Sequence, residues 1–259
     1  MGGTEAIRSG KDGRGGLGNI LSGLAVAIGF ALFLGGFVWG AVIYRPYTVP
    51  TDSMMPTVRP GDRVLAQRID GGEVRRGDVV IFTDSMWSDS PMVKRVVGIG
   101  GDTVKCCDAG GGLTVNGTPL DEPYADTTRP DTGLAMPPGQ APAPGTPFEV
   151  VVPDGNLFLL GDRRAASLDS RAHLQEAGQG TVPRSAVSAR VDALAWPSMA
   201  MLERPRTYAG LPGGVSRAGP LLFQVAAVAV GAALVVLGAA YGPLVRVLGR
   251  GRRERSSVR

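Results

Sequence analysis

Residues 19–44 read NILSGLAVAIGFALFLGGFVWGAVIY and contain no charged side chain. As an α-helix this segment would be about 39 Å long at ~1.5 Å per residue, which is enough to cross the hydrocarbon core of a bilayer. Trp39 and Tyr44 lie toward one end, where aromatic side chains commonly meet the membrane surface. A cleaved secretory signal would be shorter, and the Arg-Pro-Tyr that follows offers no small-residue cleavage site. We therefore expect a membrane-spanning helix over residues 19–44.

A second uncharged segment, LLFQVAAVAVGAALVVLGAAYG, covers residues 221–242 between Pro220 and Pro243. A buried core helix is the alternative interpretation. Six arginines and one glutamate follow Val245, however, and basic residues are enriched on the cytoplasmic side of membrane helices. This flank favours a second membrane span over residues 220–245.

The basic residues at both ends predict how the chain crosses the membrane. The positive-inside rule places residues 1–18 and 246–259 in the cytoplasm, with 246–259 as a disordered basic tail at the lipid surface. Residues 45–219 would then face outward from a two-pass protein of the plasma membrane. The formal net charge of +4 comes from these ends, so the composition excludes the basic stripe of a nucleic-acid-binding domain.

The outward region has the pattern of a mainly β domain. Short apolar runs alternate with Gly-Asp and Asn-Gly pairs, and an Asn-Gly pair between two strand-like runs is a hairpin signal. Residues 121–147 are rich in proline and glycine with little apolar periodicity, and we expect an irregular insertion there. The predicted strands cover residues 63–66, 78–82, 94–99, 113–115, 148–152, 157–160 and 187–194.

Two residue types in this region are candidates for chemistry. Ser53 lies between prolines in Pro-Thr-Asp-Ser-Met-Met-Pro-Thr, residues 50–57, where the prolines restrict the loop. A plain turn serine is the alternative. The chain has only three lysines against 24 arginines, and Lys94 lies in a strand-like run whose burial would lower its pKa. A solvated strand charge is the alternative for Lys94.

Other catalytic arrangements have less support. The sequence has no Gly-x-Ser-x-Gly elbow, and His173 is the one histidine that could serve a Ser-His-Asp triad. A single histidine excludes a multi-histidine metal site, and two cysteines are too few for a disulfide framework. The adjacent Cys106 and Cys107 lack the spacing of a metal site, and the alternatives for them are a vicinal disulfide in an oxidising compartment or two free thiols. We expect no metal and no cofactor.

Four sequence blocks together resemble the bacterial type I signal peptidases, which are membrane-anchored serine proteases. The resemblance covers residues from about 48 to 104, then 113 to 119 and 156 to 194. The fourth block departs from the family pattern GDNRxxSxDSR, because Arg163 replaces the asparagine. In chain order the blocks are Ser53–Thr57, Gly61–Val64, Arg76–Val80 leading to Lys94–Asp102, and Gly161–Arg171.

The resemblance implies a catalytic dyad. Ser53 would be the nucleophile, and a neutral Lys94 would be its general base. Ser167 would orient the lysine, and the Thr51 hydroxyl would join the Ser53 N–H in the oxyanion hole.

The same resemblance assigns supporting and substrate-contacting roles. Asp169 and Arg171 would support the site, and Met54 would line the substrate pocket. Lys105 has no counterpart in the blocks, and we interpret Lys105 and His173 as structural residues.

For the whole chain, the resemblance implies a signal-peptidase/LexA-like β catalytic domain held by an N-terminal and a C-terminal membrane helix. The partners would be the bilayer and the signal peptides of exported preproteins, cut after Ala-x-Ala-like sites. One alternative is a non-catalytic membrane-anchored scaffold of the cell envelope on the same fold. Another is a self-cleaving regulator with a Ser/Lys dyad, although the chain has no DNA-binding module.

Overall fold

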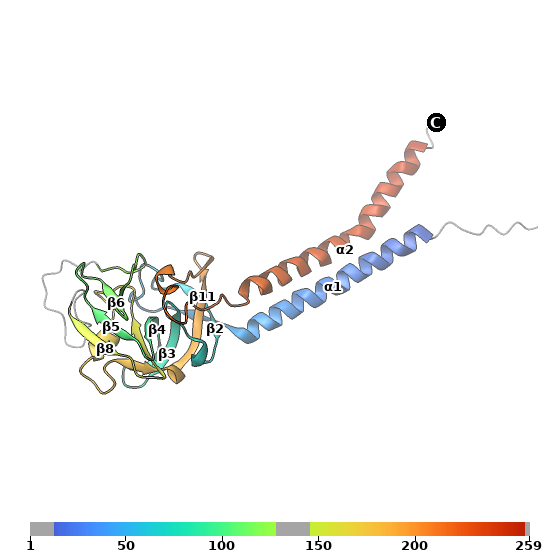
Figure 1. Cartoon of the computed structure of the whole chain (residues 1–259). Coiled ribbons are helices and arrows are strands. Elements are labelled where there is room, and N and C mark those ends of the chain that lie inside the picture. Colours follow the sequence, from blue (N-terminus) through green and yellow to red (C-terminus); the bar gives the residue numbers. More distant parts are fainter. Residues whose placement is uncertain (1–12, 128–145, 257–259) are drawn as a thin grey trace, which may run out of the picture. The chain divides into compact units, whose positions relative to one another are not determined.

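The computed structural model describes residues 13–127 and 146–256 and divides the chain into two units. One unit contains the two long helices near the ends of the chain, and the other, Ile43–Gly219, contains the strands (Figure 1). The predicted mainly β fold is therefore confirmed. Of the predicted insertion at 121–147, residues 128–145 lie outside the described residues, as do residues 1–12 of the N-terminal flank.

Within the described part of the chain, the larger sheet has eight antiparallel strands. Their order is β1-β2-β11-β3-β4-β9-β10, with β12 paired to β11. The strands nearest the candidate chemistry, β3 and β4, are neighbours in the middle of this sheet. The bounds are β1 Tyr44–Thr48, β2 Arg63–Arg68, β3 Val79–Asp84, β4 Ser88–Ile99, β9 Asn156–Leu160, β10 Thr181–Pro183, β11 Val187–Trp196 and β12 Ala200–Met201.

The smaller sheet has the order β7-β6-β5-β8 and is also antiparallel. The predicted Asn-Gly hairpin joins β6 to β7, with φ of 54° at Asn116 and 77° at Gly117. Two successive positive φ values are those of a type I′ turn, whose twist matches paired strands. The bounds are β5 Thr103–Cys106, β6 Leu113–Val115, β7 Thr118–Pro119 and β8 Phe148–Val151.

Apolar side chains from both sheets fill three core clusters. One cluster joins residues of the smaller sheet, such as Val104 and Val115, to Phe158 and Leu160 of β9. The other two clusters gather residues of the larger sheet. Short 3-10 turns lie in the connections at Gly71–Glu73, Ser170–His173, Arg184–Ala186 and Arg206–Tyr208.

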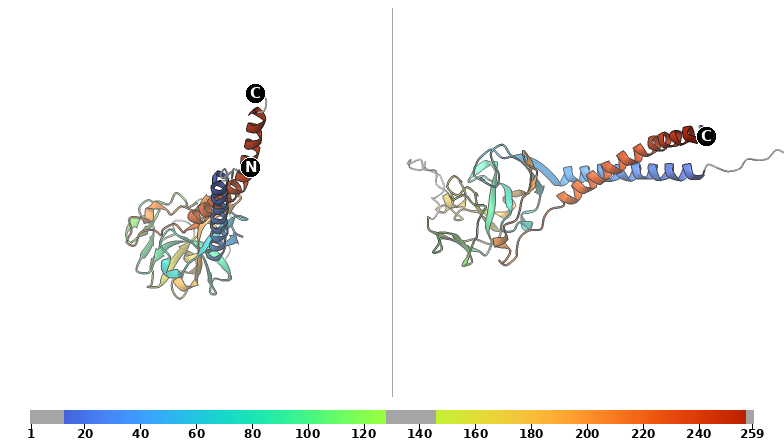
Figure 2. Two further views of the ribbon diagram at one scale, coloured as in Figure 1. Left: turned by 90° about the vertical axis from the view of Figure 1, so that its right-hand side faces the viewer. Right: turned by 90° about the horizontal axis from the view of Figure 1, so that it is seen from above.

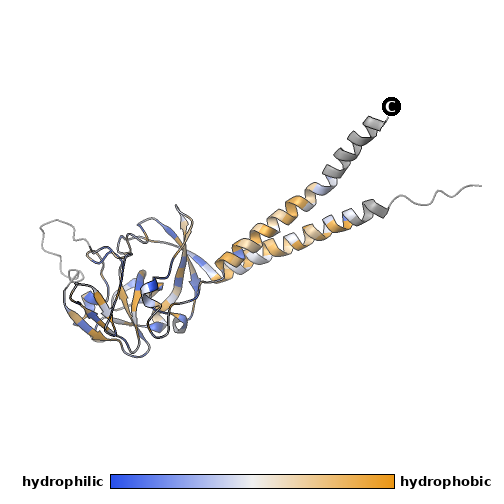
Figure 3. Cartoon of the chain, turned by 45° about the horizontal axis from the view of Figure 1, so that its top comes forward, coloured by the Kyte–Doolittle hydropathy of each residue, from blue (hydrophilic) through white to orange (hydrophobic). Residues whose placement is uncertain are grey.

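The helical unit contains α1, Gly13–Ile43, and α2, Leu221–Ser256. Segments Gly18–Ile43 and Leu221–Pro243 are long and apolar enough to cross a membrane. Their apolar character runs along most of the described length of both helices (Figure 3). Large side chains such as Phe37 and Phe223 are exposed, which suits a segment surrounded by lipid better than a soluble core helix.

The two helices run side by side (Figure 2) and pack through glycines. A Cβ built at Gly231 would lie 2.5 Å from the backbone nitrogen of Phe33 and 2.6 Å from the carbonyl oxygen of Gly29. The hydroxyl of Ser22 donates to the carbonyl of Gly238 at 2.7 Å. Small residues and such hydrogen bonds are the usual contacts between helices in a membrane.

The second helix differs from the sequence-based expectation at its C-terminal end. Where the sequence predicted a disordered tail from residue 246, α2 continues through Pro243 to Ser256. Proline removes one helical hydrogen bond and bends a helix without ending it when both flanks are helical, and α2 changes direction toward its C-terminal part (Figure 1). The sequence interpretation ended the helix at residue 245 and expected disorder beyond it, and this expectation was wrong for residues 246–256.

Candidate active site

Ser53 lies in the connection between β1 and β2, which runs over residues 49–62. The amide of Met55 donates to the carbonyl of Asp52 at 3.0 Å, and the amide of Val58 donates to the carbonyl of Met54 at 2.9 Å. These turns fold the loop back on itself and leave Ser53 only 6% exposed. The proline-flanked segment is therefore an ordered turn that holds its serine in one place.

Lys94 lies in β4, and its amine donates a 2.8 Å hydrogen bond to the Ser53 hydroxyl. The five residues from Lys94 to Gly98 are all buried. Strand β4 is central in its sheet, between β3 and β9, so both of its edges are paired. The sheet thus carries the amine into the protein interior and directs it at the serine.

Burial lowers the pKa of Lys94 from the ordinary 10.5 to about 8. The charge of Asp169 opposes this shift and that of Arg171 adds to it. At pH 7 a lysine with this pKa is neutral in about one molecule in ten, compared with about one in three thousand at a pKa of 10.5. A usable fraction of the amine is therefore free to accept a proton.

The loop from Gly161 to Arg171 follows β9 and lies against the serine turn. The amide of Arg163 donates to the carbonyl of Ser53 at 3.0 Å. A Cβ built at Gly161 would lie 2.0 Å from the Ser167 hydroxyl and 2.6 Å from the Ser53 carbonyl oxygen. Only glycine allows this close approach of the two loops, so Gly161 is a position where a side chain would displace the candidate nucleophile.

Asp169 and Arg171 form a buried pair at the base of this loop. Arg171 donates to both carboxylate oxygens, with Nε–Oδ1 at 2.9 Å and Nη2–Oδ2 at 2.7 Å, and the amide of Gly161 donates to Oδ2 at 3.0 Å. Burial works against ionisation of Asp169, but the charge and hydrogen bonds of Arg171 outweigh it and hold the carboxyl pKa below its ordinary value. The pair therefore fixes the loop while keeping a negative charge near Lys94.

The remaining predicted site residues occupy different environments. The Thr51 hydroxyl lies 3.3 Å from that of Ser53. The Ser167 hydroxyl is buried and has no hydrogen-bond partner within residues 13–127 and 146–256, so its predicted bond to Lys94 is not formed in this structure. Met54 is fully buried in a core cluster with Val58 and Ile81, and its role in substrate binding stays a prediction.

Residues left outside the predicted site have other partners. His173 contacts Glu176 at 2.8 Å and stacks on Trp87 with 4.4 Å between ring centroids. Lys105 forms an exposed ion pair with Glu149. The part of the chain that the structure describes contains no cluster of three histidine, cysteine, aspartate or glutamate side chains suited to a metal.

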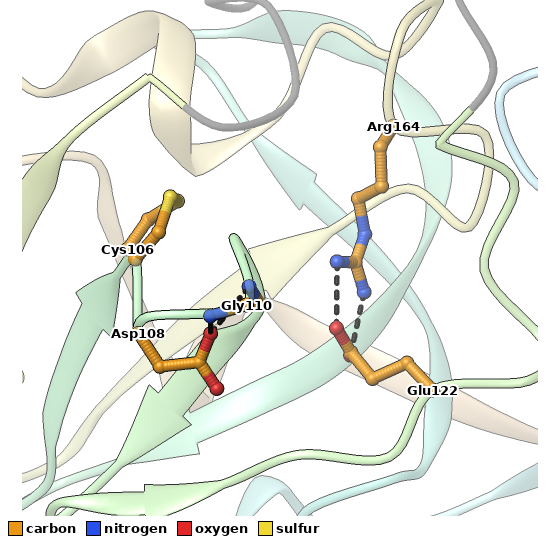
Figure 4. The surroundings of a disulfide bond; sticks show 7 residues. Cys106, Asp108, Gly110, Glu122 and Arg164 are labelled. Carbon is orange, nitrogen blue, oxygen red and sulfur yellow. Dashed lines mark hydrogen bonds and ion pairs between the residues drawn. A yellow bond between two sulfur atoms is a disulfide. The ribbon is translucent and has the colours of Figure 1, made fainter.

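The adjacent cysteines lie beside the site rather than in it. Cys106 and Cys107 are joined by a disulfide. Cys106 lines a cavity with Arg164 and Arg171, to which neither Ser53 nor Lys94 contributes. On the far side of this region Arg164 makes a paired contact with Glu122, at 2.7 and 2.8 Å (Figure 4).

Sequence reasoning missed a buried ion pair that supports both loops. Arg95, the neighbour of Lys94, donates to Asp162 through Nε at 2.8 Å and Nη2 at 2.6 Å, and to the Gly77 carbonyl at 2.9 Å. The guanidinium lies 4.1 Å from the ring centroid of Tyr124. An arginine within an otherwise apolar strand was the available signal, because such a residue is rarely buried without a partner.

This arrangement can support acyl transfer. A hydroxyl within hydrogen-bond distance of an amine that is partly neutral at pH 7 is the minimum of an activated nucleophile. A second hydroxyl, that of Thr51, lies 3.3 Å from the Ser53 hydroxyl, and its role as an oxyanion donor stays a prediction.

Comparison with known proteins agrees with this chemistry. The model of the family described as signal peptidase, peptidase S26, matches residues 21–196. The chain belongs to this family. The match covers the first apolar helix, the serine turn, the lysine strand and the Gly161–Arg171 loop, so the chain is a peptidase with a fold of the signal peptidase I type.

Named relatives support the same assignment. The chain is 32% identical over 204 residues to signal peptidase I of Mycobacterium tuberculosis strain H37Rv, covering 62% of this chain and 68% of the relative. It is 32% identical over 182 residues to signal peptidase IB of Staphylococcus aureus strain N315, covering 67% and 87%. A solved signal peptidase I from Enterococcus faecalis V583 is 26% identical and matches 45% of this chain and 94% of its own length, with a TM-score of 0.32 that is too low to add to the assignment.

Proposed function

We propose that Ser53 and Lys94 are the catalytic dyad with which this serine protease removes N-terminal signal peptides from exported preproteins. Signal peptide removal by a serine protease follows from membership of the family. The observation that carries the dyad is the 2.8 Å hydrogen bond between the Lys94 amine and the Ser53 hydroxyl at a buried position.

The reaction follows from these positions. Neutral Lys94 takes the proton of Ser53 as its hydroxyl oxygen attacks the scissile carbonyl, forming a tetrahedral intermediate. The Ser53 N–H and the Thr51 hydroxyl stabilise the negative oxygen. Lys94 then gives its proton to the leaving amine, and an acyl-enzyme remains on Ser53. Neutral Lys94 then takes a proton from a water molecule as the water oxygen attacks the acyl carbonyl, and Lys94 returns this proton to the Ser53 oxygen as the ester bond breaks and the acid product leaves.

The rest of the loop sets the geometry for these steps. The buried Asp169–Arg171 pair holds Gly161, and Gly161 sets the distance between the loop and Ser53. The Ser167 hydroxyl packs against Gly161 and is buried with no hydrogen-bond partner within the described residues, so it is available to accept a bond from Lys94. We assign Ser167 to orienting the lysine and Asp169 and Arg171 to holding the loop.

We further propose that the peptidase unit lies outside the cytoplasm and that both helices cross the plasma membrane. The two apolar helices support this topology, and the basic residues of the flanks support cytoplasmic termini. A signal peptide spans the same bilayer, and the enzyme would cut it on the outer side after an Ala-x-Ala-like site. Small pockets for the alanines would give this preference by excluding larger side chains.

Cleavage of a preprotein with an Ala-x-Ala site by the detergent-solubilised full chain tests the proposal. The wild type should release the mature protein with a new N-terminus immediately after the second alanine, identified by mass spectrometry. Ser53→Ala and Lys94→Ala should each abolish cleavage while retaining the far-UV circular dichroism of the wild type. Cleavage that survives either substitution would contradict the dyad. A folded wild type that cuts no preprotein would favour the scaffold alternative.

A further inference from the structure

The residue that departs from the family pattern makes a specific contact at the site. Arg163, which stands where the family motif has asparagine, forms an ion pair with Asp52. Asp52 lies between the oxyanion candidate Thr51 and the nucleophile Ser53. The side chains are partly accessible, at 27% for Arg163 and 45% for Asp52. The contact is therefore partly accessible to solvent and lies beside the reacting serine in the sequence.

A backbone contact accompanies this ion pair. The amide of Arg163 donates to the carbonyl of Ser53, the residue after Asp52, at 3.0 Å. The carbonyl of Arg163 accepts a 3.0 Å hydrogen bond from the amide of Ala166 within its own loop. One residue thus joins the two loops through its main chain and its side chain together, which limits rotation of the serine turn as well as its displacement.

Lys94 faces several charges, and each carboxylate among them has its own arginine. The charged groups that act on Lys94 are Asp169, Arg171, Asp162 and Asp52. Asp169 pairs with Arg171, Asp162 pairs with Arg95, and Asp52 pairs with Arg163. Asp52 is the one of these three carboxylates whose arginine stands where the family motif has asparagine, and the charge of Asp52 raises the pKa of Lys94.

We propose that Arg163 is a positioning residue that, together with Asp52, holds the Thr51–Ser53 turn against the Gly161–Arg171 loop and screens the Asp52 carboxylate from Lys94. This inference rests on the proposed roles of Ser53 and Lys94. In this arrangement the arginine that stands in place of the motif's neutral amide pairs with the acid next to the nucleophile.

The test uses the full chain in detergent and measures kcat and KM from pH 6 to 10 with an Ala-x-Ala preprotein. The variants are Arg163→Gln, Asp52→Asn, the two combined, and Arg163→Lys. The matched control is Lys105→Gln, which breaks the exposed 3.1 Å pair with Glu149 on the smaller sheet.

In the Arg163→Gln variant we expect kcat at pH 7 to fall about tenfold with KM within about twofold, since small misplacements of a reacting group have effects of this order. The midpoint of the kcat/KM profile should move to higher pH, because the unscreened Asp52 favours charged Lys94. Arg163→Lys should recover most of the activity. Adding Arg163→Gln to Asp52→Asn should move the midpoint no further.

Two results would overturn the inference. An Arg163→Gln variant that behaves like Lys105→Gln would mean that the contact is an ordinary surface ion pair, of the kind that contributes little. A loss of kcat with an unchanged pH midpoint, equal in the single and double variants, would exclude screening of Asp52. Ser53→Ala and Lys94→Ala in the same assay distinguish a failure of the proposed function from a failure of this inference. If they stay active the proposed function fails, whereas if they are inactive and Arg163→Gln is neutral only this inference fails.

Discussion

Replacing Lys94 by methionine should stabilise the β unit while abolishing the peptidase. The lysine is 5% exposed, and the charged form of a buried amine is destabilised relative to water. Methionine has nearly the same length and flexibility and carries no charge, so the substitution removes this penalty with little change of packing.

The size of the effect follows from the shift in pKa. The folded-state pKa of about 8 is below the ordinary 10.5, so unfolded chains bind the proton more tightly. Below pH 8 the lysine is charged in both states, and the shift of about 2.5 units corresponds to a cost of about 3 kcal/mol. The lost hydrogen bond to Ser53 offsets about 1 kcal/mol of this. Lys94→Met should therefore be more stable than the wild type by about 2 kcal/mol at pH 7.

The lowered pKa of Lys94 also determines the direction in which stability changes with pH. As pH rises from about 8 to 10.5, the wild type gains stability because its folded state has already released the proton that the unfolded state still holds. The stability of Lys94→Met relative to the wild type should therefore fall by about 3 kcal/mol across this window, from about 2 kcal/mol more stable to about 1 kcal/mol less stable.

Urea unfolding of both proteins in the same detergent, followed by near-UV circular dichroism at pH 7, 9 and 10.5, measures this difference directly. Taking the difference cancels the groups that titrate equally in the two proteins. A variant that is less stable than the wild type at pH 7, or a difference that does not change with pH, would refute the account of Lys94.

Three further predictions concern Gly161, Thr51 and Gly231. Gly161→Ala should lower kcat about a hundredfold, because the added methyl group would overlap the Ser167 hydroxyl and the Ser53 carbonyl oxygen. Gly72→Ala adds its methyl group to open space and should keep wild-type activity, and equal kcat values for the two variants would contradict this prediction. Thr51→Val should lower kcat by ~10²–10³ with little change in KM, and a change in KM alone would exclude an oxyanion role. Gly231→Leu should reduce cross-linking of an engineered cysteine pair between α1 and α2 in membranes, because Gly231 contacts the backbone of α1. Gly35→Leu, at a position with open space, should leave cross-linking unchanged. Unchanged cross-linking in both variants would contradict packing through glycine.

Local chemistry made much of the fold predictable. The Asn116–Gly117 turn and the short alternating runs indicated hairpins, and strands formed at each predicted run because these signals act over a few neighbouring residues. Pro243 shows where prediction from local sequence fails. A proline can end a helix or bend it, and which occurs depends on whether the following residues can continue the helix.

The candidate site was predictable where a single residue type carried the signal and not where a pair did. A lysine retained among 24 arginines indicated a special role for Lys94, and the structure places its amine at Ser53. The Arg95–Asp162 and Asp52–Arg163 pairs join residues 67 and 111 positions apart. Such partners are chosen by tertiary packing, which one sequence without an alignment does not reveal.

The pH dependence of kcat/KM for an Ala-x-Ala preprotein tests the central claim, that neutral Lys94 is the base for Ser53. With a pKa of about 8, the neutral fraction rises about tenfold between pH 7 and 9 and then levels off. The account predicts that kcat/KM follows this curve in the wild type and that Lys94→Ala has no cleavage at any pH. A flat profile from pH 7 to 9, or a profile that is still rising tenfold per unit above pH 9, would contradict it.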